Sequence, residues 1–244
     1  MEFKEKVAIV TGSSSGIGKA VAKQLINEGA MVIGIDIQNK VVENSHHLIC
    51  DVGNEYDVIS AIEKVTKITN KVDYLVNAAG ILTVGSRTQI KEQKLEQWEK
   101  ILLVNMTGVL LMMKHTYELL KVSSAGAIVN ISSDQANNSL EKSAPYAVSK
   151  AGINVLTRIA ANEMYDDNIR VNAVAAGEVH TNFLSTLVDN EMVIKRMYKQ
   201  IERKLPFGLA EPEDIASLVC YLLSEQAKCI TGQVILLDSG KSIR

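Results

Sequence analysis

Short runs of β-branched residues alternate with longer segments of helical period along the chain, and this alternation limits the possible folds more than any other feature. The first segments are KVAIV at 6–10, a helical pattern from 16 to about 28, and AMVIGI at 30–35. Further strand candidates are HLIC at 47–50, DYLV at 73–76, AIVNI at 127–131, RVNAV at 170–174 and QVILL at 233–237. Nearly continuous apolar runs are typical of parallel strands that helices cover on both faces.

Amphipathic segments lie between these strand candidates. They fall near 54–69, 95–121, 146–165, 182–204 and 212–224, and each is long enough to be a crossover helix. The order predicts an α/β fold, a doubly wound seven-stranded parallel sheet with helices on both faces. The sequence shows no internal repeat and no linker rich in proline or glycine, so we expect a single domain over 1–244.

Charge and cysteine content argue against several classes of partner. A formal net charge of −2 is too small to attract nucleic acid or an anionic membrane. The three cysteines form no CxxC pair and are interpreted as small core residues, and the histidines lack partners at metal spacing, so we expect no metal site. The start lacks the features of a signal peptide, and the long apolar stretch at 101–115 is too short and too polar to span a bilayer. We expect a cytoplasmic protein.

A glycine-rich turn, TGSSSGIG at 11–18, directly follows the first strand and opens the first helix. A pyrophosphate at this place must contact backbone N–H groups and the positive end of the helix dipole, so side chains cannot intrude. Gly12 permits the tight turn, Gly16 lets the backbone approach phosphate, and Gly18 lets the helix pack on the strand. We therefore expect dinucleotide contacts from Gly12, Ser14, Ser15, Gly16, Ile17 and Gly18.

Asp36 ends the second strand, eighteen residues after Gly18. A carboxylate at this position accepts hydrogen bonds from the adenosine ribose and repels a 2′-phosphate. Because no basic residue directly precedes Gly16 or follows Asp36, NAD is favoured over NADP. The alternative interpretation of Asp36 is an ordinary turn residue.

These features and others occur in the order found in the short-chain dehydrogenase/reductase family, and the chain resembles its compact single-domain branch nearly from end to end. The resemblance rests on TGSSSGIG, Asp51-Val52, NAAG at 77–80, Asn105, NISS at 130–133, Tyr146-x-x-x-Lys150, and a near match to the turn Asn-Ala-Val-x-Pro-Gly at 172–177. It implies an oxidoreductase that acts on CH–OH groups with a nicotinamide cofactor. It also implies a homotetramer, with the helices near 98–120 and 146–165 at the subunit contacts.

The resemblance further assigns cofactor contacts. Asp51 and Val52 would hold the adenine, Asn77, Ala78, Ala79 and Gly80 would line the ribose, and Val179 with Thr181 would hold the carboxamide beyond the turn at Gly177. Two positions depart from the family pattern. Ala176 replaces a proline, which could loosen the turn, and Asp238-Ser239-Gly240 replaces Asp-Gly-Gly.

The proposed chemistry rests on Ser133, Tyr146 and Lys150. Hydride transfer to a carbonyl leaves an oxygen that needs a proton, and a tyrosine can exchange that proton if its pKa is lowered. Lys150 lies one turn after Tyr146, where its ammonium can stabilise the phenolate and also bind the cofactor ribose. Ser133 would donate a hydrogen bond to the substrate oxygen. By resemblance alone, Asn105 would hold a water that relays protons to Lys150.

A second Tyr-x-x-x-Lys pair, Tyr117 and Lys121, shows that this spacing is weak by itself. Tyr146 follows Ser133 by thirteen residues, which is the family spacing, whereas Val104 stands thirteen residues before Tyr117. We therefore interpret Tyr117 as a helix surface or interface residue. No GxSxG motif surrounds Ser133, which argues against a hydrolase.

Substrate choice is expected from the polar segment at 134–142, the loop at 81–96 and a helical flap at about 181–204, which carries Phe183, Leu184, Leu187 and Val188. The polar segment suits a sugar, and the chain is somewhat similar to aldohexose dehydrogenases, but the same residues could be a solvated loop. A 3-oxoacyl-carrier-protein reductase is the alternative enzyme. A protein that senses NAD without turnover is the alternative of another class.

Overall fold

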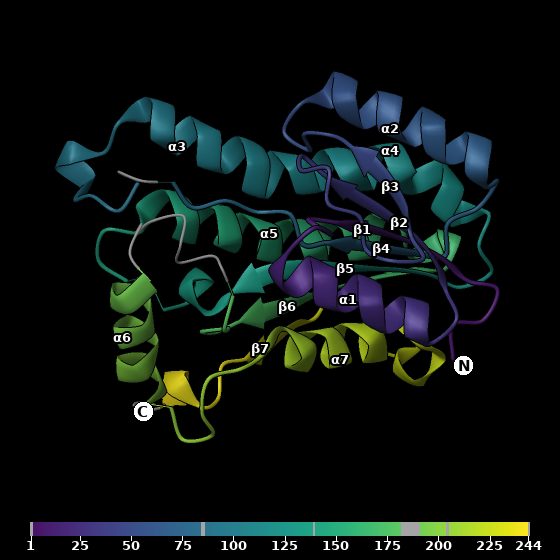
Figure 1. The fold of residues 1–244 in the computed structure, drawn as a ribbon. Coiled ribbons are helices and arrows are strands. Elements are labelled where there is room, and N and C mark those ends of the chain that lie inside the picture. The colour runs from purple at the N-terminus through teal and green to yellow at the C-terminus, as the bar shows by residue number, and fades with distance from the viewer. Residues whose placement is uncertain (1, 84–85, 139, 182–190, 204, 244) are drawn as a thin grey trace.

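A parallel sheet of seven strands runs through the computed structural model, which describes residues 2–83, 86–138, 140–181, 191–203 and 205–243 (Figure 1). The strands are β1 Val7–Thr11, β2 Met31–Asp36, β3 His46–Ile49, β4 Tyr74–Asn77, β5 Gly126–Ser133, β6 Ile169–Ala176 and β7 Val234–Leu237. Their order is β3-β2-β1-β4-β5-β6-β7, and every neighbouring pair is parallel. The predicted doubly wound fold is confirmed.

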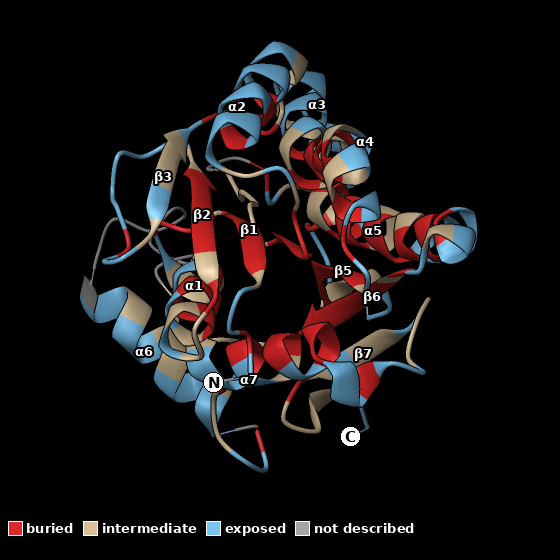
Figure 2. Ribbon diagram, turned by 90° about the vertical axis from the view of Figure 1, so that its right-hand side faces the viewer, coloured by how far each residue is buried: buried red, intermediate tan, exposed pale blue. Residues whose placement is uncertain are grey.

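Helices cover both faces of this sheet. They are α1 Gly16–Asn27, α2 Glu55–Ile68, α3 Leu95–Leu102, α4 Gly108–Lys121, α5 Ala144–Glu163, α6 Glu191–Glu202 and α7 Pro212–Leu223. One apolar core lies between the sheet and α1 with α7, and a second lies between the sheet and α2, α4 and α5 (Figure 1). The central strands are therefore buried on both sides, whereas the outer helix surfaces are exposed (Figure 2). This double burial explains the continuous apolar runs in the sequence.

The segment at 95–121 is interrupted, although its apolar pattern indicated one continuous helix. A π-helical turn, η2 Leu103–Thr107, joins α3 to α4. Asn105 lies inside this turn and is fully buried. The interruption leaves no clear sign in the sequence because one wide turn barely changes the spacing of apolar residues.

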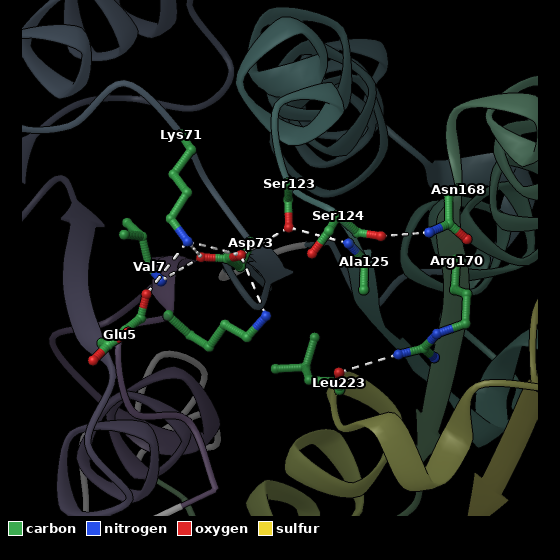
Figure 3. Close-up of polar contacts among 11 residues, drawn as sticks. Glu5, Val7, Lys71, Asp73, Ser123, Ser124, Ala125, Asn168, Arg170 and Leu223 are labelled. Carbon is green, nitrogen blue, oxygen red and sulfur yellow. Dashed lines mark hydrogen bonds and ion pairs between the residues drawn. The ribbon is translucent and has the colours of Figure 1, made fainter.

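The amino ends of the strands are tied together by Asp73, whose side chain is only 1% exposed (Figure 3). Its carboxylate accepts hydrogen bonds from the Val7 backbone N–H at 2.9 Å and the Ser123 hydroxyl at 2.7 Å, and it pairs with Lys71 at 3.2 Å. Burial alone would raise the pKa of Asp73, but these bonds hold it below its usual value. The cluster joins the starts of β1 and β4 to the end of α4.

Arg170 makes a similar tie on the other side of the sheet (Figure 3). From β6 its guanidinium donates to the carbonyl oxygens of Leu222 at 2.6 Å, Leu223 at 3.1 Å and Ser224 at 3.2 Å. These carbonyls lie at the carboxyl end of α7, where helix carbonyls lack partners within the helix and a cation is favoured. The amino edge of the sheet is therefore held by a buried carboxylate and a half-buried guanidinium, each with defined partners.

The cysteines follow the prediction only in part. Cys50 and Cys220 are buried, and burial raises the pKa of each thiol to about 12. Cys229 is exposed, contrary to the expectation of a core residue, because it lies in the turn before β7 rather than in an apolar run. Within the described ranges, no helix is long and apolar enough to cross a membrane, and no group of three potential metal ligands occurs.

Candidate active site

A cavity of about 900 Å³ opens at the carboxyl ends of the strands. The ends of parallel strands meet at this edge of a doubly wound sheet, so side chains from distant parts of the chain can share one pocket. The structure brings these predicted residues into its walls: Gly12, Ser15, Gly16, Ile17, Gly18, Asp36, Asp51, Val52, Ala78, Ala79, Gly80, Ser133, Tyr146, Lys150, Gly177, Val179 and Thr181. Ser14, Asn77 and Asn105 lie outside the walls and support residues that line them.

The glycine turn is too close to its neighbours for side chains at two positions. Gly12 has a φ of +67°, and a Cβ there would lie 2.9 Å from the backbone of Ala79. A Cβ on Gly18 would lie 2.3 Å from the Gly12 carbonyl oxygen. Ser15 precedes α1 and makes no side-chain capping hydrogen bond, so the first N–H groups of the helix are not capped by it. This end of the cavity suits a phosphate group.

Thr11 organises the same end, a role that the sequence did not reveal. Its hydroxyl oxygen accepts hydrogen bonds from the backbone N–H groups of Ala78 and Ala79, each at 3.1 Å. The turn after β1 is thereby fixed to the turn after β4. A threonine before the glycine motif was the available signal, but its partners are 67 and 68 residues away.

Asp36 closes the far end of the cavity. Its carboxylate accepts hydrogen bonds from the backbone N–H groups of Ser14 at 3.0 Å and Gln38 at 2.9 Å. The Ser14 hydroxyl donates to the Lys40 carbonyl at 2.9 Å, so Ser14 holds the segment after β2 against the glycine turn. Lys40 also lines the cavity. The sequence interpretation did not include this cation, which lies four residues after Asp36.

Asn77 and Asn105 support the site from the interior. The Asn77 side-chain amide donates to the Asn130 side-chain oxygen at 2.8 Å, which links β4 to β5. Asn105 accepts from the Ile81 N–H at 2.7 Å and donates to the Ile81 carbonyl at 3.0 Å, so the π-helical turn fixes the backbone beside Gly80. The proton relay expected at Asn105 stays a prediction.

Ser133, Tyr146 and Lys150 meet in the middle of the cavity. Ser133 ends β5, Tyr146 lies in the first turn of α5, and the two hydroxyl groups share a hydrogen bond. The Ser133 hydroxyl also donates a hydrogen bond to an oxygen of the Asp134 carboxylate at 3.1 Å. The Lys150 ammonium lies 5.6 Å from the centre of the Tyr146 ring and donates to the Ile131 carbonyl at 2.8 Å. The hydroxyls can therefore act on one oxygen atom.

The pKa of Tyr146 differs from the expectation of a lowered value. Burial raises it to about 12, and the hydrogen bond with Ser133 offsets only part of this effect. Burial also lowers the pKa of Lys150 to about 8, and the ammonium donates to the Ile131 carbonyl. With the protein's own groups alone, Tyr146 is therefore a protonated acid at neutral pH.

The second Tyr-x-x-x-Lys pair lies elsewhere. The Tyr117 hydroxyl donates a hydrogen bond to Asp167, and the Lys121 ammonium pairs with the same carboxylate at 3.3 Å. Neither residue is among those that line the cavity. This pair ties the end of α4 to the turn before β6, as expected for a residue outside the site.

The substrate end contains residues that the sequence interpretation included and one that it missed. Of the polar segment at 134–142, Asp134 and Gln135 line the cavity, joined by Glu178, which was not predicted. The replacement of proline by Ala176 leaves β6 paired in register with both neighbours through that residue. The predicted flap falls partly outside the described residues, including Phe183, Leu184, Leu187 and Val188, and its described part is α6.

Comparisons with known proteins agree with this geometry. A family model described as "Enoyl-(Acyl carrier protein) reductase" matches residues 12–242. The chain is 32% identical to an uncharacterized oxidoreductase of Thermotoga maritima, over 99% of both chains, and 32% identical to a 3-oxoacyl-[acyl-carrier-protein] reductase of Aquifex aeolicus, over 98% of both. The ligand-free aldohexose dehydrogenase of Thermoplasma acidophilum superposes with a TM-score of 0.91 and 31% identity, over 99% of this chain and 96% of that one. The chain belongs to the short-chain dehydrogenase/reductase family and is an oxidoreductase of the kind that uses a nicotinamide cofactor.

Proposed function

We propose that this protein is an NAD-dependent dehydrogenase that transfers a hydride between the nicotinamide and an alcohol or carbonyl carbon of a small, hydroxyl-rich substrate such as a sugar. The meeting of the Ser133 and Tyr146 hydroxyls in one cavity that begins at the glycine turn carries this proposal. The carboxylate of Asp36 in the same wall supports NAD over NADP.

The residues present fit a dinucleotide. The glycine turn leaves no room for a Cβ at Gly12 where phosphates would lie, and Asp36 would accept bonds from the ribose. When bound, the nicotinamide supplies or accepts the hydride. With substrate present, the Ser133 hydroxyl would turn from Asp134 and donate its hydrogen bond to the substrate oxygen. Tyr146 gives that oxygen a proton in reduction and takes one in oxidation. Lys150 stabilises the phenolate that forms.

The substrate class rests on the polar side chains that line the cavity near Ser133. Asp134, Gln135 and Glu178 supply hydrogen-bond acceptors there. The likeness to an aldohexose dehydrogenase agrees with a sugar. The relative that reduces 3-oxoacyl carrier protein makes that reaction the second candidate, but Asp36 argues against the NADPH that we expect it to need.

A homotetramer is the assembly that we propose. Apolar side chains are exposed along α5 at Val148, Val155 and Ile159, and also at Leu103 in the π-helical turn and Leu110 in α4. Exposed apolar residues at helical spacing favour an interface between copies. Light scattering should give the tetramer mass, and charged residues at positions 155 and 159 should lower it. The cytoplasmic location stays a prediction from the sequence.

A panel of aldoses, polyols and 3-hydroxyacyl thioesters, each assayed with NAD and NADP, tests the function. We expect NAD-linked oxidation of at least one sugar or polyol, and Tyr146→Phe should lower kcat by about 10²- to 10⁴-fold with little change in NADH affinity. Tyr117→Phe is the matched control, because it removes the hydroxyl of the other Tyr-x-x-x-Lys pair. Activity on thioesters alone would support the reductase, and undiminished activity of Tyr146→Phe would refute the mechanism.

A further inference from the structure

Two carboxylates and one ammonium form a cluster at the substrate end of the cavity. Asp134 follows β5, Glu178 follows β6, and Lys241 begins η7, the 3₁₀ turn Lys241–Ile243 after β7. The Lys241 ammonium lies 2.8 Å from the Asp134 carboxylate and 3.0 Å from the Glu178 carboxylate. Asp134 and Glu178 line the cavity, and Lys241 supports both without being part of that lining.

The position of Lys241 is fixed by its own turn. The Asp238 carboxylate accepts hydrogen bonds from the backbone N–H groups of Gly240 at 3.0 Å and Ser242 at 2.8 Å. The Lys241 N–H donates to the Asp238 carbonyl at 3.0 Å. These three hydrogen bonds fix the turn that carries Lys241, and the turn places the ammonium between the loops that follow β5 and β6.

Burial distinguishes this cluster from an ordinary surface ion pair. The side chain of Asp134 is 3% exposed, whereas those of Glu178 and Lys241 are 26% and 29% exposed. Burial alone would lower the pKa of Lys241, but its bonds to the two carboxylates raise it, so the lysine stays charged. A buried carboxylate without a cation is costly, which makes Lys241 the ion-pair partner that stabilises the Asp134 side chain in this position.

The cluster acts directly beside the reacting oxygen. Asp134 Oδ1 lies 3.1 Å from the Ser133 hydroxyl, the group that we assign to the substrate oxygen. Two carboxylates and one ammonium leave one net negative charge on this wall. Ionised carboxylates only accept hydrogen bonds, so the wall matches hydroxyl groups, which donate, and repels carboxylates and phosphates.

We infer that Lys241 is a positioning residue that holds Asp134 and Glu178 as a substrate-selecting wall, which favours neutral hydroxyl-bearing substrates over anionic ones of the same size. The inference rests on the proposed dehydrogenase function and adds to it the charge of the substrate. It also predicts that a residue close to the carboxyl end of the chain affects selectivity without contacting the substrate.

The first test compares matched neutral and anionic substrates: galactose with galacturonate, glucose with glucuronate, and glycerol with glycerate. For the pair with the highest rate, the parent should favour the neutral member by on the order of tenfold in kcat/KM. Glu178→Gln keeps the shape of the side chain but removes one negative charge, so this ratio should fall severalfold toward one. Glu63→Gln, on the exposed surface of α2, is the control and should leave the ratio unchanged.

The second test addresses Lys241 itself. Lys241→Met should raise KM for the neutral substrate by on the order of tenfold while kcat changes less, because the carboxylates lose their common partner. Lys241→Arg should restore most of the affinity, which a purely structural role in the turn would not require. Lys228→Met, an exposed lysine before β7, is the control for loss of a surface charge.

The outcomes separate the two proposals. A parent that oxidises no member of any pair overturns the dehydrogenase proposal and this inference with it. An active parent that favours the anionic member, or whose ratio is the same in Glu178→Gln, overturns the inference alone. If Lys241→Met does not fold, Glu178→Gln and Lys241→Arg still decide the matter.

Discussion

Replacement of Asp36 by asparagine tests the choice of cofactor with one change of charge. Asp36 is partly buried in the cavity wall, where a 2′-phosphate would carry about −1.5 to −2 charges. Two unit charges about 4 Å apart repel by about 1 kcal/mol in water and about 4 kcal/mol at an effective dielectric of 20. At a dielectric between these two limits, the repulsion between Asp36 and the 2′-phosphate is about 3 kcal/mol, which lowers the affinity for NADPH by about 100-fold.

Asparagine removes this repulsion, and Lys40 in the same wall then attracts the phosphate. Asp36→Asn should therefore change the ratio of NADPH to NADH affinity by about 100-fold in favour of NADPH. Both cofactors also lose affinity, because the carboxylate binds the Ser14 and Gln38 N–H groups through both oxygens and an amide offers only one acceptor. The ratio is for this reason the informative quantity.

Fluorescence titration of bound NADH and NADPH measures this ratio without any substrate. Lys40→Met in the Asp36→Asn background is the companion variant, and it should reverse part of the gain by lowering NADPH affinity severalfold. A parent that binds both cofactors equally well would refute the reasoning. So would an Asp36→Asn variant whose ratio stays within about threefold of the parent, since a charge of this size cannot then lie near the 2′ position.

Three further predictions concern pH and backbone conformation. Burial raises the pKa of Tyr146 to about 12, and oxidation needs the phenolate, so the oxidation rate should rise between about pH 7 and about pH 9.5. The reduction rate should not rise, because reduction needs the phenol. An oxidation rate that does not change with pH would contradict this. Gly12→Ala places a Cβ 2.9 Å from Ala79 at positive φ, so it should cost about 2–4 kcal/mol in urea unfolding and weaken NADH binding. Ser239 has a φ of +54°, a conformation that is costly for a residue with a Cβ. Ser239→Gly should therefore raise the free energy of unfolding by up to about 1 kcal/mol. An unchanged or lower free energy of unfolding would show that the serine side chain compensates for the strain.

Features encoded locally could be predicted from the sequence. The strands and helices follow from apolar runs and periodicity, and the glycine turn is recognisable because its glycines stand close together between the first strand and the first helix. Ser133 and Tyr146 were placed together through their spacing and the order of the family motifs. Each of these inferences depends on neighbours in sequence or on a fold that the alternation already determines.

Contacts between distant loops could not be predicted. Lys241 pairs with Asp134 across 107 residues and with Glu178 across 63, and no local pattern encodes such a meeting. The lowered pKa expected for Tyr146 was wrong for a related reason. Proximity of Lys150 in the helix was visible in the sequence, but the desolvation of both groups and the bond from Lys150 to Ile131 depend on tertiary packing.

The two ends of the sheet use buried charge for different purposes. At the amino edge, Asp73 and Arg170 bond to other groups of the protein, and these bonds join secondary-structure elements. At the carboxyl edge, burial raises the pKa of Tyr146 to about 12 and lowers that of Lys150 to about 8, which makes either charged form costly until a ligand provides compensation. Stability can therefore be lost at one edge without loss of the reactive geometry, and reactivity can be changed at the other without loss of the fold. Substitutions at Arg170 should accordingly lower Tm but leave kcat, measured well below Tm, nearly unchanged. The ties at the amino edge lie at the opposite end of the strands from the cavity.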